Sequence, residues 1–183
     1  MTTRAAAIRS GVNLEYFTVA WNLAEAAAGL LFGAVAGSIA LIGFGLDSLI
    51  EVSSGGVLLW RLHSDHDHTR REVIEARALK LVGVSLLALA LYVAVDSLVS
   101  LVRHNAPERS LPGIALAIAS LIAISKQTDI CAYLSAILLL GLLLNAALDW
   151  WWADPLAGLM MVPLIAYEGT QALRGKTCCG NCG

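Results

Sequence analysis

Charged residues are scarce in this chain. Asp, Glu, Lys and Arg make up 14% of the 183 residues, against 58% hydrophobic residues, and the mean hydropathy is +0.73. This balance excludes an ordinary soluble domain and is typical of an integral membrane protein. The sequence also lacks a nucleotide-binding loop, a nucleophile constellation and a CxxC pair within a folded domain. We therefore expect no enzyme and no nucleic-acid partner.

Basic residues are missing from the long apolar stretches that carry acids. Residues 10–60 contain no Lys or Arg, yet they include Glu25, Asp47 and Glu51, and a further apolar stretch holds Asp96. A carboxylate buried in lipid without a basic partner is costly, so it either stays protonated or holds a cation. The pattern indicates a cation pathway through a membrane.

The apolar stretches predict an all-α, polytopic transmembrane bundle of six spans. A hydrocarbon core of roughly 30 Å needs about 20 helical residues per crossing. The candidate spans cover approximately residues 12–35, 38–60, 79–102, 111–124, 130–151 and 155–173. The fourth is short, about 21 Å of helix at 1.5 Å per residue, and a polar run at 125–129 leads into the fifth. We expect one transport domain, 1–175, and a Cys-rich cytoplasmic tail, 176–183.

Basic residues predict the orientation of the bundle, because cytoplasmic loops retain Lys and Arg. In a six-span arrangement only Arg103 and Arg109 fall on one side. The other side holds Arg4, Arg9, Arg61, Arg70, Arg71, Arg77, Lys80, Lys126, Arg174 and Lys176. Both termini are therefore expected in the cytoplasm. The first span is too long for a signal peptide and carries Glu25, so we expect it to be retained.

Small residues and a proline predict local packing. Gly29, Gly33 and Gly37 recur every four residues, a spacing that lets two helices approach closely in lipid, so the first two helices should form a tight hairpin. Asp154 followed by Pro155 predicts the N-cap and first turn of the sixth helix.

Asp47 and Glu51 are four residues apart, so their carboxylates share one face of the second helix. Such a pair forms half of a metal site if a second helix adds ligands. The alternative is a pair of neutral acids hydrogen-bonded inside the bundle, and the absence of a basic partner favours the metal ligands. Glu25 and Asp96 are either ion-path residues or structural acids.

The run from Gly37 to Glu51, GSIALIGFGLDSLIE, and the run WADPLA at 152–157 resemble the second-helix and sixth-helix signatures of the cation diffusion facilitators. The resemblance is closest to short prokaryotic members without a C-terminal cytoplasmic domain. It implies a six-helix bundle in the inner membrane, a homodimer, and export of a divalent metal, most simply Zn²⁺, by exchange for protons. No permanently bound cofactor is implied.

The resemblance also assigns site residues. Asp47 and Glu51 match the acidic pair that the family's second helix gives to its transport site. The fifth helix of the family adds a further pair four residues apart, and these positions fall near Gln127 and Cys131, with Asp129 as a neighbouring ion-path candidate. A cysteine ligand favours zinc, cadmium or copper(I); alternatively, Cys131 is a small core residue. A bundle with an incomplete site would be a non-transporting, metal-binding or regulatory membrane protein.

Two segments have the composition of cytoplasmic metal-capture sites. His63, His66 and His68 mix imidazoles with carboxylates between the second and third spans, although a solvated polar turn has the same composition. Cys178, Cys179 and Cys182 place three thiols in the tail, where a reducing cytoplasm favours metal binding over a disulfide. The expected partners are a divalent metal ion, protons, the lipid bilayer and a second copy of the chain.

Overall fold

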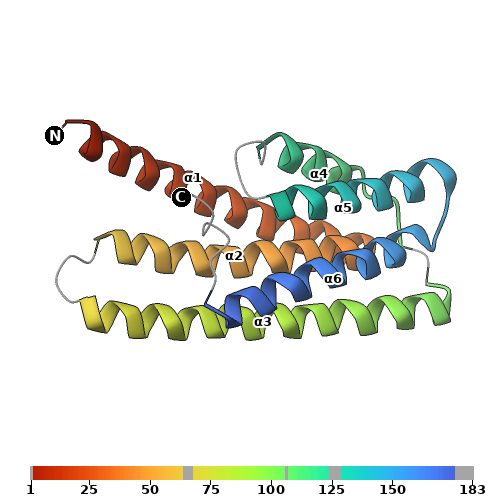
Figure 1. The fold of residues 1–183 in the computed structure, drawn as a ribbon. Helices are drawn as coiled ribbons and strands as arrows, with labels where there is room; N and C mark the ends of the chain where they lie inside the picture. The colour runs from red at the N-terminus through yellow and green to blue at the C-terminus, as the bar shows by residue number, and fades with distance from the viewer. Residues whose placement is uncertain (1, 64–67, 106, 124–128, 176–183) are drawn as a thin grey trace.

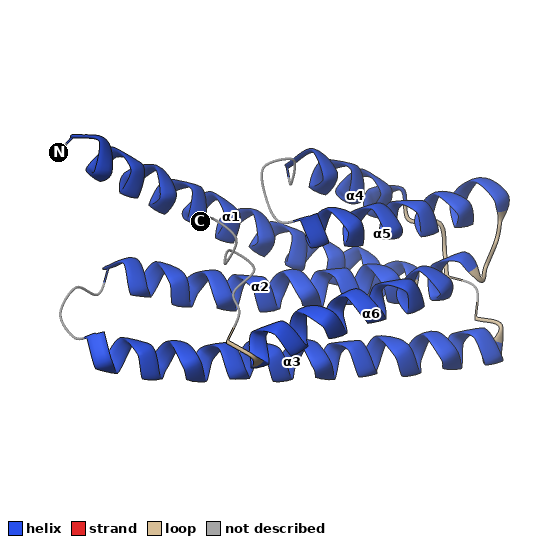
Figure 2. Ribbon diagram, viewed as in Figure 1, coloured by secondary structure: helices blue, strands red, loops and turns tan. Residues whose placement is uncertain are grey.

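The computed structural model of the chain is all-α, as the apolar pattern predicts. It describes residues 2–63, 68–105, 107–123 and 129–175, and these ranges contain six helices and no strand (Figures 1 and 2). The helices are α1 (Thr2–Ala36), α2 (Ile39–His63), α3 (His68–Arg103), α4 (Leu111–Ala123), α5 (Asp129–Leu148) and α6 (Ala153–Leu173).

Five of these helices are long and apolar enough to cross a membrane, so the chain is built as an integral membrane protein. The exception is α4, which has 13 residues and extends about 20 Å at 1.5 Å per residue. This confirms a short fourth helix. Whether α4 crosses the bilayer completely stays a prediction.

Two helices begin earlier than the predicted spans. The first span was expected from residue 12 and the third from residue 79, whereas α1 begins at Thr2 and α3 at His68. The added residues are rich in Ala, Arg and Glu, which favour helix formation but not insertion into lipid. Hydropathy marks where a helix enters the bilayer, so these polar extensions were not predicted.

The helices pack side by side as pairs. α1 packs along α2, α3 along α6 and α4 along α5, while α2 also contacts α3, α5 and α6 (Figure 1). The largest fully buried apolar side chains come from α2, α3, α5 and α6 and include Leu41, Val93, Leu134, Leu138, Met161 and Ile165. The core therefore lies where these four helices meet.

The predicted hairpin of α1 and α2 is present. A Cβ added to Gly29 would lie 2.9 Å from the Cα of Gly45, and one added to Gly33 would lie 2.7 Å from a side-chain carbon of Ile42. Only glycine allows backbones this close. Gly37 has a different role from the one predicted, because it follows the end of α1 with φ +65°, and beyond its chain neighbours no atom of a described residue lies within 4 Å of its added Cβ.

Asp154 caps another helix than the sequence predicts. Residue Trp152 precedes α6, and no side chain caps that helix end. Instead, the Asp154 carboxylate accepts hydrogen bonds from the Ser38 hydroxyl (2.5 Å) and from the Ile39 backbone N–H (2.9 Å) at the start of α2. Asp154 is 1% exposed. The N-cap prediction for α6 was wrong because the capped helix is distant in sequence.

Replacing Asp154 should therefore loosen the junction between α2 and α6. We expect Asp154→Ala to lower the free energy of unfolding by about 2–4 kcal/mol, because it removes two hydrogen bonds to a buried carboxylate. Denaturation in detergent micelles measures the loss. The matched control is Asp149→Asn, since the Asp149 side chain is 72% exposed and should contribute less than about 1 kcal/mol. Equal stabilities for the two variants would contradict the capping role.

Candidate cation site

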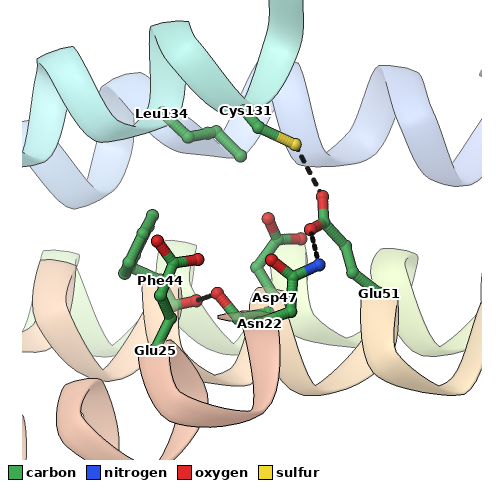
Figure 3. A pocket seen from close by; sticks show the side chains of 8 residues that line it. Asn22, Glu25, Phe44, Asp47, Glu51, Cys131 and Leu134 are labelled. Carbon is green, nitrogen blue, oxygen red and sulfur yellow. Dashed lines mark hydrogen bonds between the residues drawn. The ribbon is translucent and has the colours of Figure 1, made fainter. Parts of the chain in front are cut away.

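A small pocket lies between α1, α2 and α5. Eight residues line it: Asn22, Glu25, Phe44, Asp47, Ser48, Glu51, Cys131 and Leu134 (Figure 3). Its volume of about 10 Å³ is close to what a single water molecule needs. Among the described residues that line it none is basic, and three are acidic. The pocket therefore gathers negative and polar groups where the membrane would surround the bundle.

Asp47 has a buried carboxylate oxygen without a hydrogen-bond partner among the described residues. It is 3% exposed, and within the described part of the chain its Oδ1 atom has no hydrogen-bond partner. A buried acceptor without a donor carries its full desolvation cost, so native proteins rarely leave one. The oxygen atom lies in a residue that lines the pocket. A proton or a cation at this position would satisfy it.

Glu51 connects three helices. It lies one turn from Asp47 on α2, and its Oε2 accepts a hydrogen bond from Asn22 Nδ2 on α1 at 2.6 Å. Its Oε1 accepts one from the Cys131 thiol on α5 at 2.7 Å, as Figure 3 shows. The structure thus brings the predicted residues Asp47, Glu51 and Cys131 together. Cys131 is 8% exposed and contacts Glu51, which a small core residue need not do.

Glu25 lies on the same pocket but is better satisfied. Its Oε1 accepts a hydrogen bond from Trp21 Nε1 at 2.5 Å, and Ser48 on α2 and Ser120 on α4 lie near its carboxylate. Ser120 is in turn 2.8 Å from the Ser135 hydroxyl on α5. Glu25 is 2% exposed. These contacts suit a structural acid, and the position beside Asp47 suits an ion path, so both interpretations remain.

Two residues near the pocket were missed by the sequence analysis. Asn22 donates a hydrogen bond to Glu51. The sequence feature that could have pointed to Asn22 is its polar side chain within the first apolar span, three positions before Glu25. Glu168 lies on α6, is 6% exposed, and is near enough to interact electrostatically with Asp47 and Glu51. The sequence feature that could have pointed to Glu168 is that it is the single acid within the sixth apolar span. Neither residue belongs to a local motif, so only the packing of the helices reveals it.

The other predicted residues lie elsewhere or outside the described ranges. Asp96 lies on α3 outside the pocket, where the Tyr92 hydroxyl donates to it at 3.4 Å. Asp129 begins α5, His63 ends α2 and His68 begins α3. Four predicted metal-capture residues and one predicted site residue fall outside the described residues, namely His66, Cys178, Cys179, Cys182 and Gln127.

The described residues of the pocket do not form a complete metal-binding site. Across the described residues, no group of three or more His, Cys, Asp and Glu side chains is placed to hold a metal ion. The hydrogen bond between Cys131 and Glu51 occupies two atoms that could otherwise bind a metal ion, the Cys131 sulfur and one Glu51 oxygen. A metal ion would have to replace the thiol proton and draw the Asp47 and Glu51 carboxylates toward itself.

Comparison of the whole chain with protein-family models and with curated protein sequences found no match. The functional conclusion therefore depends on the site.

Metal binding should appear as a gain in stability that depends on the acidic pair. We expect Zn²⁺ to raise the unfolding temperature of the protein in detergent, since a ligand at 100 times its Kd stabilises by about 2.7 kcal/mol. In protein whose tail residues Cys178, Cys179 and Cys182 are replaced by Ser, Asp47→Asn and Glu51→Gln should lose this shift. Asp96→Asn should retain it, because Asp96 lies outside the pocket. A shift that persists without Asp47 and Glu51 would contradict the assignment of the site.

Proposed function

We propose that the protein is a divalent metal cation transporter of the zinc type, which exports metal from the cytoplasm by exchange for protons. One observation carries the proposal: the buried Oδ1 atom of Asp47 lacks a hydrogen-bond partner among the described residues, beside Glu51 in a pocket without basic lining residues. A site of this kind favours a bound proton or cation over an empty state.

The position of the acidic pair supports transport. Asp47 and Glu51 are the ninth and thirteenth of the 25 residues of α2, so they lie near the middle of a helix long enough to cross the membrane. Transporters commonly place ion sites near the bilayer midplane, where both faces of the membrane are equally distant. Protons and metal would compete for the same carboxylates, which couples their movements.

The chemistry of the donors supports zinc or cadmium. Two carboxylates suit many divalent ions, but the Cys131 thiol beside Glu51 adds a soft ligand that magnesium and calcium do not prefer. The resemblance of residues 37–51 and 152–157 to the cation diffusion facilitators agrees with this choice. On the same grounds we propose that the protein is a homodimer in a prokaryotic inner membrane, with both termini in the cytoplasm. The segment from His63 to His68 and the tail cysteines would capture metal there.

A second candidate is a metal-binding or regulatory membrane protein that does not transport. The observation in its favour is that the described residues do not assemble three metal ligands. A bundle that binds metal weakly and does not release it across the membrane would keep the same pocket. Binding without transport distinguishes this candidate from the first.

Zinc uptake into proteoliposomes tests the proposal. With the cytoplasmic face outward and an acidic lumen, we expect Zn²⁺ to accumulate as protons leave. Asp47→Ala and Glu51→Ala should reduce uptake to that of protein-free liposomes, because each removes a carboxylate from the exchange site. Asp96→Asn serves as the control and should keep most of the uptake.

Uptake that needs neither Asp47 nor Glu51 would contradict the proposed site. Zn²⁺-dependent stabilisation without uptake of zinc, cadmium, cobalt, manganese or iron would instead support the second candidate.

Cys131→Ser should change the metal preference. Replacing a soft thiol by a hard hydroxyl should lower Cd²⁺ uptake about tenfold or more and leave Mn²⁺ uptake nearly unchanged. Competition between the two ions in the same vesicles measures the ratio. Substituting Ser for Cys178, Cys179 and Cys182 together controls for the tail thiols. An equal loss for both ions would show that Cys131 acts in packing and not in ion selection.

A further inference from the structure

Gly55 occupies the next position on the face of α2 that carries the acidic pair. Asp47, Glu51 and Gly55 follow one another at intervals of four residues, so they share one face of the helix. A Cβ added to Gly55 would lie 2.9 Å from Oε1 of Glu15 and 2.6 Å from a side-chain carbon of Val19, both on α1. The carboxylate of Glu15 therefore occupies the space that a side chain at position 55 would need.

The contact between Glu15 and Gly55 lies on the line of contact between α1 and α2 that also borders the pocket, here called the α1–α2 seam. Glu15 and Asn22 are seven residues apart and share one face of α1. Asn22 hydrogen-bonds Glu51, four residues before Gly55 on α2. Two contacts between antiparallel helices thus place three carboxylates in sequence, Glu15, Glu51 and Asp47. Each step of four residues advances about 6 Å along a helix.

The seam leads from the edge of the predicted bilayer to the pocket. The apolar part of α1 begins at Val12, three residues before Glu15. Glu15 is half-buried, whereas Asp47 at the other end of the series is buried and keeps an unpartnered oxygen. Figure 1 shows the first turns of α1 extending beyond α4 and α5, on the side where α2 ends and α3 begins. By the distribution of basic residues this is the cytoplasmic side.

We infer that Glu15 is the access carboxylate at the cytoplasmic end of the α1–α2 seam, which a divalent cation meets before it reaches Glu51 and Asp47. Gly55 keeps the space for this carboxylate on the α1–α2 seam. Glu15 acts on cation arrival and is not a ligand of the pocket, because Asn22 lies about 10 Å further along α1. The inference rests on the proposed transport function. An acid at a partly buried mouth raises the local cation concentration and the association rate.

Initial rates of Zn²⁺ uptake test the inference. In proteoliposomes at low ionic strength, we expect Glu15→Gln to raise the apparent KM for Zn²⁺ about three- to tenfold and to leave the maximal rate unchanged. Glu75→Gln is the matched control, because Glu75 is half-buried at the same end of the bundle on α3, away from the seam. Its KM should equal that of the wild type.

Gly55→Ala provides a second, independent variant. The added methyl group would displace the side chains of Val19 and Glu15, so this variant should raise the KM in the same direction. The double variant Glu15→Gln, Gly55→Ala should be no worse than the poorer single variant, because both changes remove the same interaction. Zn²⁺-dependent thermal stabilisation should persist in Glu15→Gln, since the pocket itself is intact.

The outcomes separate the inference from the proposed function. Wild-type uptake with an unchanged KM in Glu15→Gln, or with only the maximal rate reduced, would overturn the access role and leave transport standing. Additive effects of the two substitutions would overturn the role given to Gly55. Absence of uptake by the folded wild-type protein would overturn both the transport function and the access carboxylate.

Discussion

The constraint on which the structure depends is the burial of carboxylates inside an apolar helical bundle. Asp47, Glu51 and Glu25 line one pocket, and the described residues around it include no basic side chain. Glu51 accepts hydrogen bonds from Asn22 and Cys131, and Glu25 accepts one from Trp21. Oδ1 of Asp47 has no such partner among the described residues, and the proposed exchange of metal for protons takes place at this acidic pair.

The close packing of α1 and α2 positions this pocket. Gly29 and Gly45 allow the two backbones to approach closely on one side of the acidic pair. On the other side, Gly55 leaves space for the Glu15 carboxylate. Glu51 can therefore reach Asn22 across the seam. At the far end, Asp154 on α6 binds the start of α2. The start of the helix that carries the acidic pair is thus bound to α6.

The fold was largely predictable from the sequence, and the site only in part. Long apolar stretches predict the helices because lipid allows few alternatives, and the four-residue spacing predicts that Asp47 and Glu51 share a face. Contacts between distant helices have no such local signal, so Asn22 and Glu168 were missed and Asp154 was assigned to the wrong helix. The polar extensions of α1 and α3 were missed because hydropathy records only the part of a helix in lipid.

The central claim is that one pair of carboxylates binds either protons or a divalent cation. Calorimetric titration with Zn²⁺ in buffers of different ionisation enthalpy tests it most directly, on protein whose tail residues Cys178, Cys179 and Cys182 are replaced by Ser. We expect binding to release protons, and Asp47→Asn to reduce both the affinity and the number released. Zn²⁺ binding without proton release, or equal release in Asp47→Asn, would contradict the account.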